Sequence, residues 1–175
     1  MKRLVVLMFA ATSLFVACSD LKQNGTEQVQ ASTNDSLFNV NEGPYRFAIY
    51  LPKDLMINDK PAIAMNGATG ELHISIGTGF HLVFTQEQKE LPQLEAELAE
   101  DALFTNKITE RKENGFVYQQ MLPSGEAYYF HYAQVSKVAD TPYLVRSWPI
   151  GEYPMEAVQR MKMAASSIHS AAKPA

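Results

Sequence analysis

The stretch LHISIGTGFHLVF, residues 72–84, contains two runs of alternating apolar and polar side chains that flank a glycine-rich turn. Alternation with a period of two is typical of strands that bury one face. A two-residue turn would place Ile74 opposite His81 and mix the two patterns. A three-residue loop at 77–79 puts every apolar side chain on one face, in the pairs Ile76–Phe80, Ile74–Leu82 and Leu72–Phe84. We therefore predict a hairpin with the longer loop.

Further strands and two helices are predicted on either side of this hairpin. Alternating apolar residues predict strands at 45–51, 62–65, 108–112, 116–122, 127–138 and 143–150. Two segments instead repeat apolar residues at helical spacing, with stripes formed by Leu91, Leu94, Leu98 and Ala102 and by Met155, Val158, Met161, Ala165 and Ile168. This order contains no alternation of single strands and helices. We therefore predict an α+β fold, with a single antiparallel sheet and two main helices packed on it.

The late run of strands that leads into a closing amphipathic helix resembles the PsbP-like α/β sandwich. This group includes extrinsic photosystem subunits of plants and several small bacterial lipoproteins. The resemblance rests on the order of elements over residues 44–170, including the strand from Tyr143 to Trp148, and on no diagnostic motif. It implies a fold used mostly for binding and assembly, without a shared active site.

The first residues have the three parts of an export signal: basic Lys2 and Arg3, an apolar run at 4–16, and a small residue before Cys18. The run of roughly 13 residues is shorter than the 20 or so that a membrane-spanning helix needs. Val16, Ala17 and Cys18 resemble the lipobox of bacterial lipoproteins. The resemblance implies cleavage before Cys18 and acylation of this residue, which would anchor the protein to a membrane permanently.

The lipobox divides the chain into three parts. We predict a signal peptide at 1–17, a lipidated cysteine with a flexible polar tether at 18–43, and a single α+β domain at 44–171. Alternatively, residues 37–40 already form a short first strand. Because Ser19 follows the cysteine where an Asp would favour the inner membrane in enteric lipoproteins, we expect a lipid anchor in the bacterial cell envelope, at the outer membrane.

Composition argues against several classes of function. The formal net charge of −4 becomes −6 when Lys2 and Arg3 are removed with the signal, so binding to nucleic acid is not expected. Cys18 is the only cysteine, and its lipidation would leave no thiol for catalysis or for metal binding. The segment 77–79 begins like a dinucleotide-binding loop but lacks the third glycine and leads into a strand. We predict no cofactor.

Candidate contact residues lie on the sheet face opposite to the six apolar side chains of the hairpin. The preferred register makes His73 and His81 diagonal neighbours on this face. We expect the same face to carry Tyr50, Tyr129 and His131, and to remain partly open because two helices cover only one side of the sheet. The remaining aromatic residues of the strands, including Trp148, are interpreted as core or cross-strand pairs.

Two classes of function remain for a domain of this kind. The leading hypothesis is a noncatalytic module that binds or scaffolds an unknown protein or cell-surface partner. The alternative is a small hydrolase or metal-binding enzyme in the periplasm or at the surface. For the alternative, His131 would join His73 and His81 as a third metal ligand, or would act with Ser124 and an Asp in a catalytic triad.

Overall fold

The predicted hairpin consists of β4 (Leu72–Ile76) and β5 (Phe80–Thr85), joined by the expected three-residue loop. Ile76 pairs with Phe80 and Leu72 pairs with Phe84, which confirms the register, and all six apolar side chains are buried. The loop requires glycine at Gly77, because its φ is +55° and an added Cβ would lie 2.6 Å from Oδ2 of Asp59.

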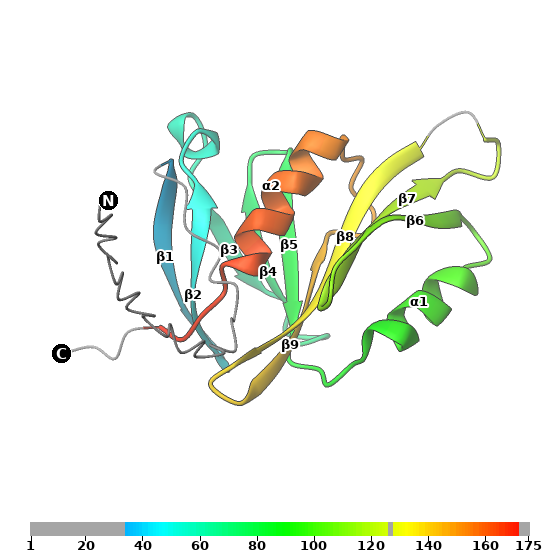
Figure 1. Cartoon of the computed structure of the whole chain (residues 1–175). Helices are drawn as coiled ribbons and strands as arrows, with labels where there is room; N and C mark the ends of the chain where they lie inside the picture. Colours follow the sequence, from blue (N-terminus) through cyan, green and yellow to red (C-terminus); the bar gives the residue numbers. More distant parts are fainter. Residues whose placement is uncertain (1–33, 126–127, 172–175) are drawn as a thin grey trace, which may run out of the picture.

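The computed structural model describes residues 34–125 and 128–171, which form an α+β fold (Figure 1). A seven-stranded antiparallel sheet has the order β3-β4-β5-β9-β8-β7-β6, and β1 and β2 form a separate two-stranded sheet. The remaining strands are β1 (Asp35–Glu42), β2 (Tyr45–Pro52), β3 (Ala62–Met65), β6 (Thr105–Arg111), β7 (Gly115–Met121), β8 (Tyr128–Val138) and β9 (Thr141–Ser147). The helices are α1 (Leu91–Ala99), α2 (Met155–Ser166) and the short 3-10 helix η1 (Leu55–Ile57).

The prediction of a single sheet is wrong, because β2 packs across the large sheet instead of joining its edge. One edge of β2 pairs with β1 along its whole length, and the other edge bonds at Ala48 to His169 of the C-terminal segment. With both edges occupied, β2 contacts the large sheet through its side chains. The ring of Phe47 lies 4.9 Å from that of Phe84, and the Tyr45 hydroxyl bonds the carbonyl of Phe84 at 2.9 Å.

Strand β1 occupies part of the segment that was predicted to be a tether. The alternative prediction, a first strand at residues 37–40, agrees with the structure, in which this strand extends from Asp35 to Glu42. Its alternation is weak in the sequence because only Phe38 and Val40 supply apolar side chains to the core, while the apolar Leu37 points outward. Val40 is fully buried, whereas Leu37 is half exposed. The tether boundary at residue 43 is therefore wrong, and residues 18–33 lie outside the described part of the chain.

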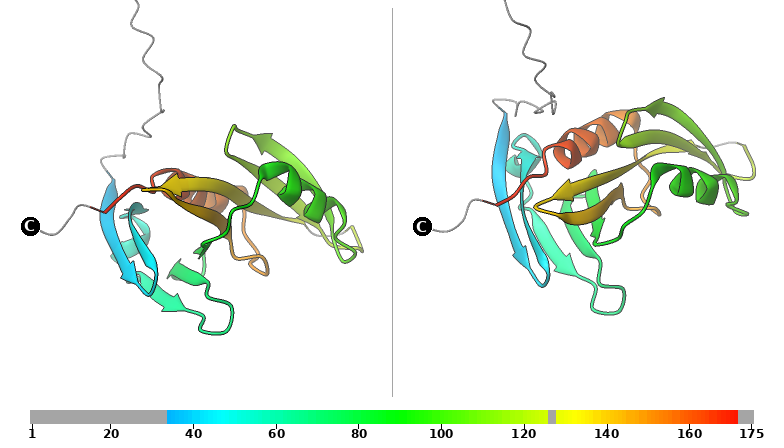
Figure 2. Two further views of the ribbon diagram at one scale, coloured as in Figure 1. Left: turned by 90° about the horizontal axis from the view of Figure 1, so that it is seen from below. Right: turned by 60° about the horizontal axis from the view of Figure 1, so that its bottom comes forward.

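The two helices lie on opposite faces of the large sheet (Figures 1 and 2). Val158 and Met161 of α2 pack into the core that contains the six hairpin residues. Leu91 and Leu94 of α1 pack against Leu144 and other residues of β7 to β9 on the other face. Both helices were predicted, but the expectation that they cover a single face is wrong. No helix among the described residues is long and apolar enough to span a membrane.

Replacing a central core ring should test this packing. Phe84 lies on β5 of the large sheet and is fully buried against Phe47 of β2. We expect Phe84→Ala to lower the free energy of unfolding by about 3–5 kcal/mol, because the removed ring leaves a cavity. Urea denaturation measures this loss. Leu103→Ala, at a position 70% exposed, is the control and should change the unfolding free energy by less than about 0.5 kcal/mol. A comparable loss in both variants would contradict the assigned core.

Candidate functional site

A cluster of three rings lies on the face of β4 and β5 that points away from the main core. It consists of His73, His81 and Trp148, and is called the ring cluster below. The Trp148 indole stacks on the His81 imidazole at 5.3 Å between centroids and meets the edge of His73 at 5.0 Å. Trp148 is held there because its backbone N–H donates to the carbonyl of His81 at 3.0 Å. Trp148, the first residue after β9, thus completes the ring cluster.

The histidines of the ring cluster also hydrogen-bond each other. Nδ1 of His73 lies 2.9 Å from Nε2 of His81, so one nitrogen donates and the other accepts. Two imidazolium rings would point hydrogens at each other across this contact, which disfavours double protonation. Burial, followed by the charge of His73, lowers the pKa of His81 below its ordinary value. Burial therefore favours the neutral form of His81.

An ion pair borders the ring cluster. Arg146 donates to Glu71 at 2.8 Å, and Oε2 of Glu71 lies 3.8 Å from Nε2 of His73. Burial acts to raise the pKa of Glu71, but hydrogen bonds from Thr69 and Arg146 outweigh it and hold the pKa below its ordinary value. The charged groups next to the ring cluster, Glu71 and Arg146, are therefore already paired with each other.

The ring cluster lies on the section of this sheet face that α1 does not cover. The core under α1 includes residues of β7, β8 and β9, but none of β3, β4 or β5. On β3, Ala62 and Ala64 face the same side as their partners Ser75 and His73, and both alanines are exposed. The rings themselves are only partly exposed, and the side chain of His73 is 15% accessible. This section forms a surface of packed rings beside an open edge strand.

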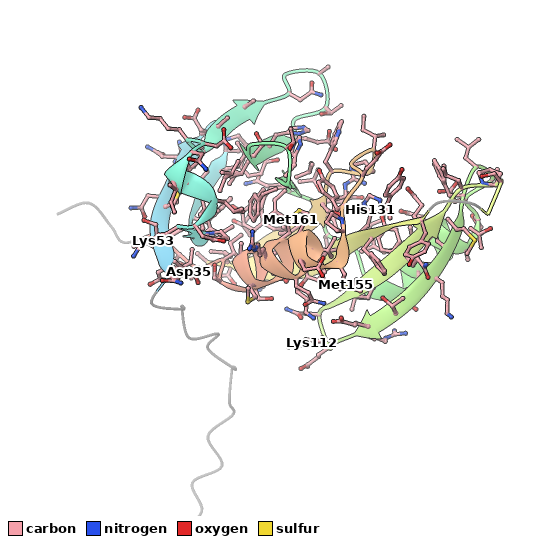
Figure 3. The ribbon with its side chains drawn as sticks, turned by 90° about the horizontal axis from the view of Figure 1, so that it is seen from above. Asp35, Lys53, Lys112, His131, Met155 and Met161 are labelled. Atoms are coloured by element: carbon pink, nitrogen blue, oxygen red, sulfur yellow. The ribbon has the colours of Figure 1, made fainter. Side chains whose placement is uncertain are left out.

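His131 does not belong to this surface, which corrects the expectation that it is a contact residue on the open sheet face. It is fully buried, stacked on Tyr118 at 5.3 Å and in edge contact with Tyr153 at 5.9 Å (Figure 3). Its Nδ1 lies 3.2 Å from the Ser147 hydroxyl, and its Nε2 has no hydrogen-bond partner within the described residues. Burial lowers the pKa of His131 to about 4. The ring is therefore a neutral core residue.

The remaining predicted contact residues are separated from the ring cluster. Tyr50 lies in β2 of the small sheet, where its ring stacks on His169 at 5.7 Å, so the expectation that it shares a face with His73 is wrong. Tyr129 lies near the start of β8, next to Glu152. Of the five predicted residues, the structure brings only His73 and His81 into contact.

No group of three or more His, Cys, Asp or Glu side chains in the described part of the chain is arranged to hold a metal ion. His131 therefore does not act as the third ligand considered for the histidine pair. No sequence pattern indicated that Trp148, Glu71 and Arg146 belong to this region. The Trp148 N–H bonds the His81 carbonyl, which continues the β5–β9 register one position past Ser147 and places Trp148 on the face of His81. The pairing of β9 with β5 is not visible in any local pattern. The ion pair joins residues 75 positions apart, which no local pattern indicates.

No family model, no curated protein and no solved structure matches this chain.

The buried His131 predicts a pH dependence of stability. Between pH 6.5 and about 4 the unfolded chain binds a proton at this residue and the folded chain does not. The free energy of unfolding should therefore decrease as the pH is lowered across this window, and this group should account for about 3 kcal/mol of the decrease. In His131→Gln this component should disappear, and urea titrations at several pH values measure the difference. The exposed His169, changed to Gln, is the control. Parallel pH profiles for wild type and His131→Gln would contradict the assignment.

Proposed function

We propose that this chain is a lipid-anchored lipoprotein of the bacterial cell envelope, attached through Cys18 at the outer membrane. The support is the order of a basic start, an apolar run and the tripeptide Val16-Ala17-Cys18. These residues precede the described part of the chain, so the proposal rests on the sequence. Acyl chains contribute about 0.8 kcal/mol per buried CH₂, and several chains would make the attachment effectively irreversible.

Changing the cysteine tests the anchor. Cys18→Ala should abolish labelling of the protein by a fatty-acid probe and release it from the membrane fraction, because the acylated sulfur is lost. Metabolic labelling followed by membrane fractionation measures both effects. Ser19→Ala, next to the cysteine, is the control and should keep its label. Undiminished labelling of Cys18→Ala would exclude the lipoprotein assignment.

We further propose that the domain is a noncatalytic module that binds a protein or cell-surface partner through the ring cluster. The observation that carries this proposal is the position of His73, His81 and Trp148 on a section of the sheet face left uncovered by α1. Aromatic rings with polar edges suit reversible contacts, because they bury apolar area while their nitrogens remain able to hydrogen-bond. Trp is also the residue type most enriched among the energetic centres of protein interfaces.

The polar groups around the ring cluster favour contact over chemistry. The facing nitrogens of the two histidines bond each other, and Glu71 bonds Arg146. A general base or nucleophile needs a free atom directed at the substrate. Here the strongest polar groups are already paired, and this pairing keeps the rings in fixed positions for a partner.

We also propose that the fold belongs to the PsbP-like group. The support is the run of antiparallel strands β6 to β9 that leads directly into the closing helix α2. This group is used mostly for binding and assembly, in agreement with the function proposed for the ring cluster.

Photo-crosslinking at the open edge tests the binding surface. A photoreactive amino acid at Ala64, the exposed neighbour of His73 on β3, should capture the partner in intact cells. The same residue placed at Ala96, which is exposed on α1, is the matched control and should capture little. Immunoblots of the tagged protein measure the crosslinked fraction. Equal capture from the two positions would contradict the assignment.

Substitution of the histidines should reduce capture. We expect His73→Gln combined with His81→Gln to lower crosslinking from position 64 at least five-fold, because the rings that support Trp148 are removed. His169→Gln changes a histidine outside the ring cluster and should leave capture unchanged. Thermal melts verify that the variants are folded. Full capture by a folded double variant would place the contact elsewhere.

A further inference from the structure

A hollow lies beside the first residues of β8, at the end of this strand that is far from the β8–β9 turn. Its volume is about 530 Å³, and its lining includes Tyr128, Phe130, Glu152, Tyr153, Met155 and Glu156. The β8–β9 ladder ends at Ala133 and Arg146, so β9 does not accompany this part of β8. The chain that enters α2 takes its place, with the Phe130 N–H donating to the carbonyl of Tyr153 at 3.0 Å. Figure 3 marks Met155 at the start of α2.

Aromatic rings form much of this hollow. Tyr128 and Phe130 meet edge to face, with centroids 5.6 Å apart and planes at 85°. Tyr128 is 55% exposed, whereas Tyr153 is buried. The face of an aromatic ring carries partial negative charge and attracts cations within about 6 Å. An exposed ring held by a second ring is therefore a suitable contact for a positive group.

The charge of the lining also favours a cation. Glu152 and Glu156 are exposed, and no described Lys, Arg or His forms an ion pair with either carboxylate. No basic residue occurs among the described residues that line the hollow. The N-terminus of α2 contributes about half a positive charge, which is less than the two negative charges of the carboxylates. The hollow is therefore electrostatically negative and carries aromatic surface.

We propose that this hollow binds an organic cation with an alkylammonium group. The methyl or methylene groups of such a cation would contact Tyr128 and Phe130, and its charge would be balanced by Glu152 and Glu156. A metal ion would not use the aromatic surface, and a neutral apolar molecule would not use the carboxylates. This site is separate from the ring cluster and does not depend on the function proposed there.

Methionine NMR provides a direct test. The full chain, labelled with ¹³C at the methionine methyl groups and held in neutral maltoside micelles, is titrated with choline. The Met155 signal, assigned from the variant Met155→Leu, should shift to saturation, while the signal of Met65 on β3 should not move. The neutral isostere 3,3-dimethylbutan-1-ol should bind at least five-fold more weakly. Equal binding of the two compounds, or no shift of Met155 with any ammonium probe, would overturn the proposal.

A second probe distinguishes the source of the ammonium group. N-acetyl-lysine methylamide carries the same charge on a primary amine, as in a peptide side chain. Stronger binding of choline would assign the site to quaternary ammonium groups, and stronger binding of the lysine derivative would assign it to protein lysines. Either result supports a site for alkylammonium cations.

Matched variants test the two components of the site. Glu152→Gln combined with Glu156→Gln should weaken binding of the better probe at least five-fold. Glu100→Gln combined with Glu113→Gln removes the same charge from exposed positions elsewhere and should have little effect. Tyr128→Leu should weaken binding, whereas Tyr128→Phe should retain it, because phenylalanine keeps the ring face. Unchanged affinity in the Glu152/Glu156 variant, with its fold verified by circular dichroism, would overturn the proposal.

Discussion

The register of the β4–β5 hairpin determines the positions of both the main core and the ring cluster. Side chains alternate between the two faces of a strand, so a slip of one residue would exchange the buried and outward sets. The observed register buries Leu72, Ile74 and their partners, and it therefore directs His73 and His81 to the opposite face. Both histidines reach hydrogen-bond distance only because they are diagonal neighbours in this register.

The core formed on the inner face of this hairpin then requires a cover, which β2 and α2 provide together. Strand β2 brings Phe47 onto Phe84 and Tyr143, at centroid distances of 4.9 and 5.5 Å. Helix α2 adds Met161 and its neighbours beside it. Because β1 and the C-terminal segment occupy both edges of β2, this cover is a separate sheet and not an eighth strand of the large one.

The opposite face of the large sheet is divided between two environments. Over β7 to β9 it is buried: α1 covers Tyr118 and Ala133, and His131 remains neutral between the rings of Tyr118 and Tyr153. Toward β3 it is open, and there the loop after β9 places Trp148 over the two histidines. The same loop continues to Glu152 and Tyr153, which line the aromatic hollow beside β8. Residues 148–156 therefore contribute to both proposed binding surfaces.

Local patterns predicted both helices, most of the strands and the register of the β4–β5 hairpin, whereas β1 fell in a segment predicted to be a tether. The period-two pattern of residues 72–84 and the helical stripe from Met155 to Ile168 depend only on which neighbouring side chains must be buried together, so both were predictable. Contacts in three dimensions were needed to place β1 and β2 in a second sheet and the helices on opposite faces of the large one. The same holds for the burial of His131 and for the position of Tyr50 in the small sheet. These outcomes depend on contacts between distant segments, such as Glu71 with Arg146 and Ala48 with His169. Periodicity reports which face of a strand is apolar, but it carries no information about which distant segment covers that face.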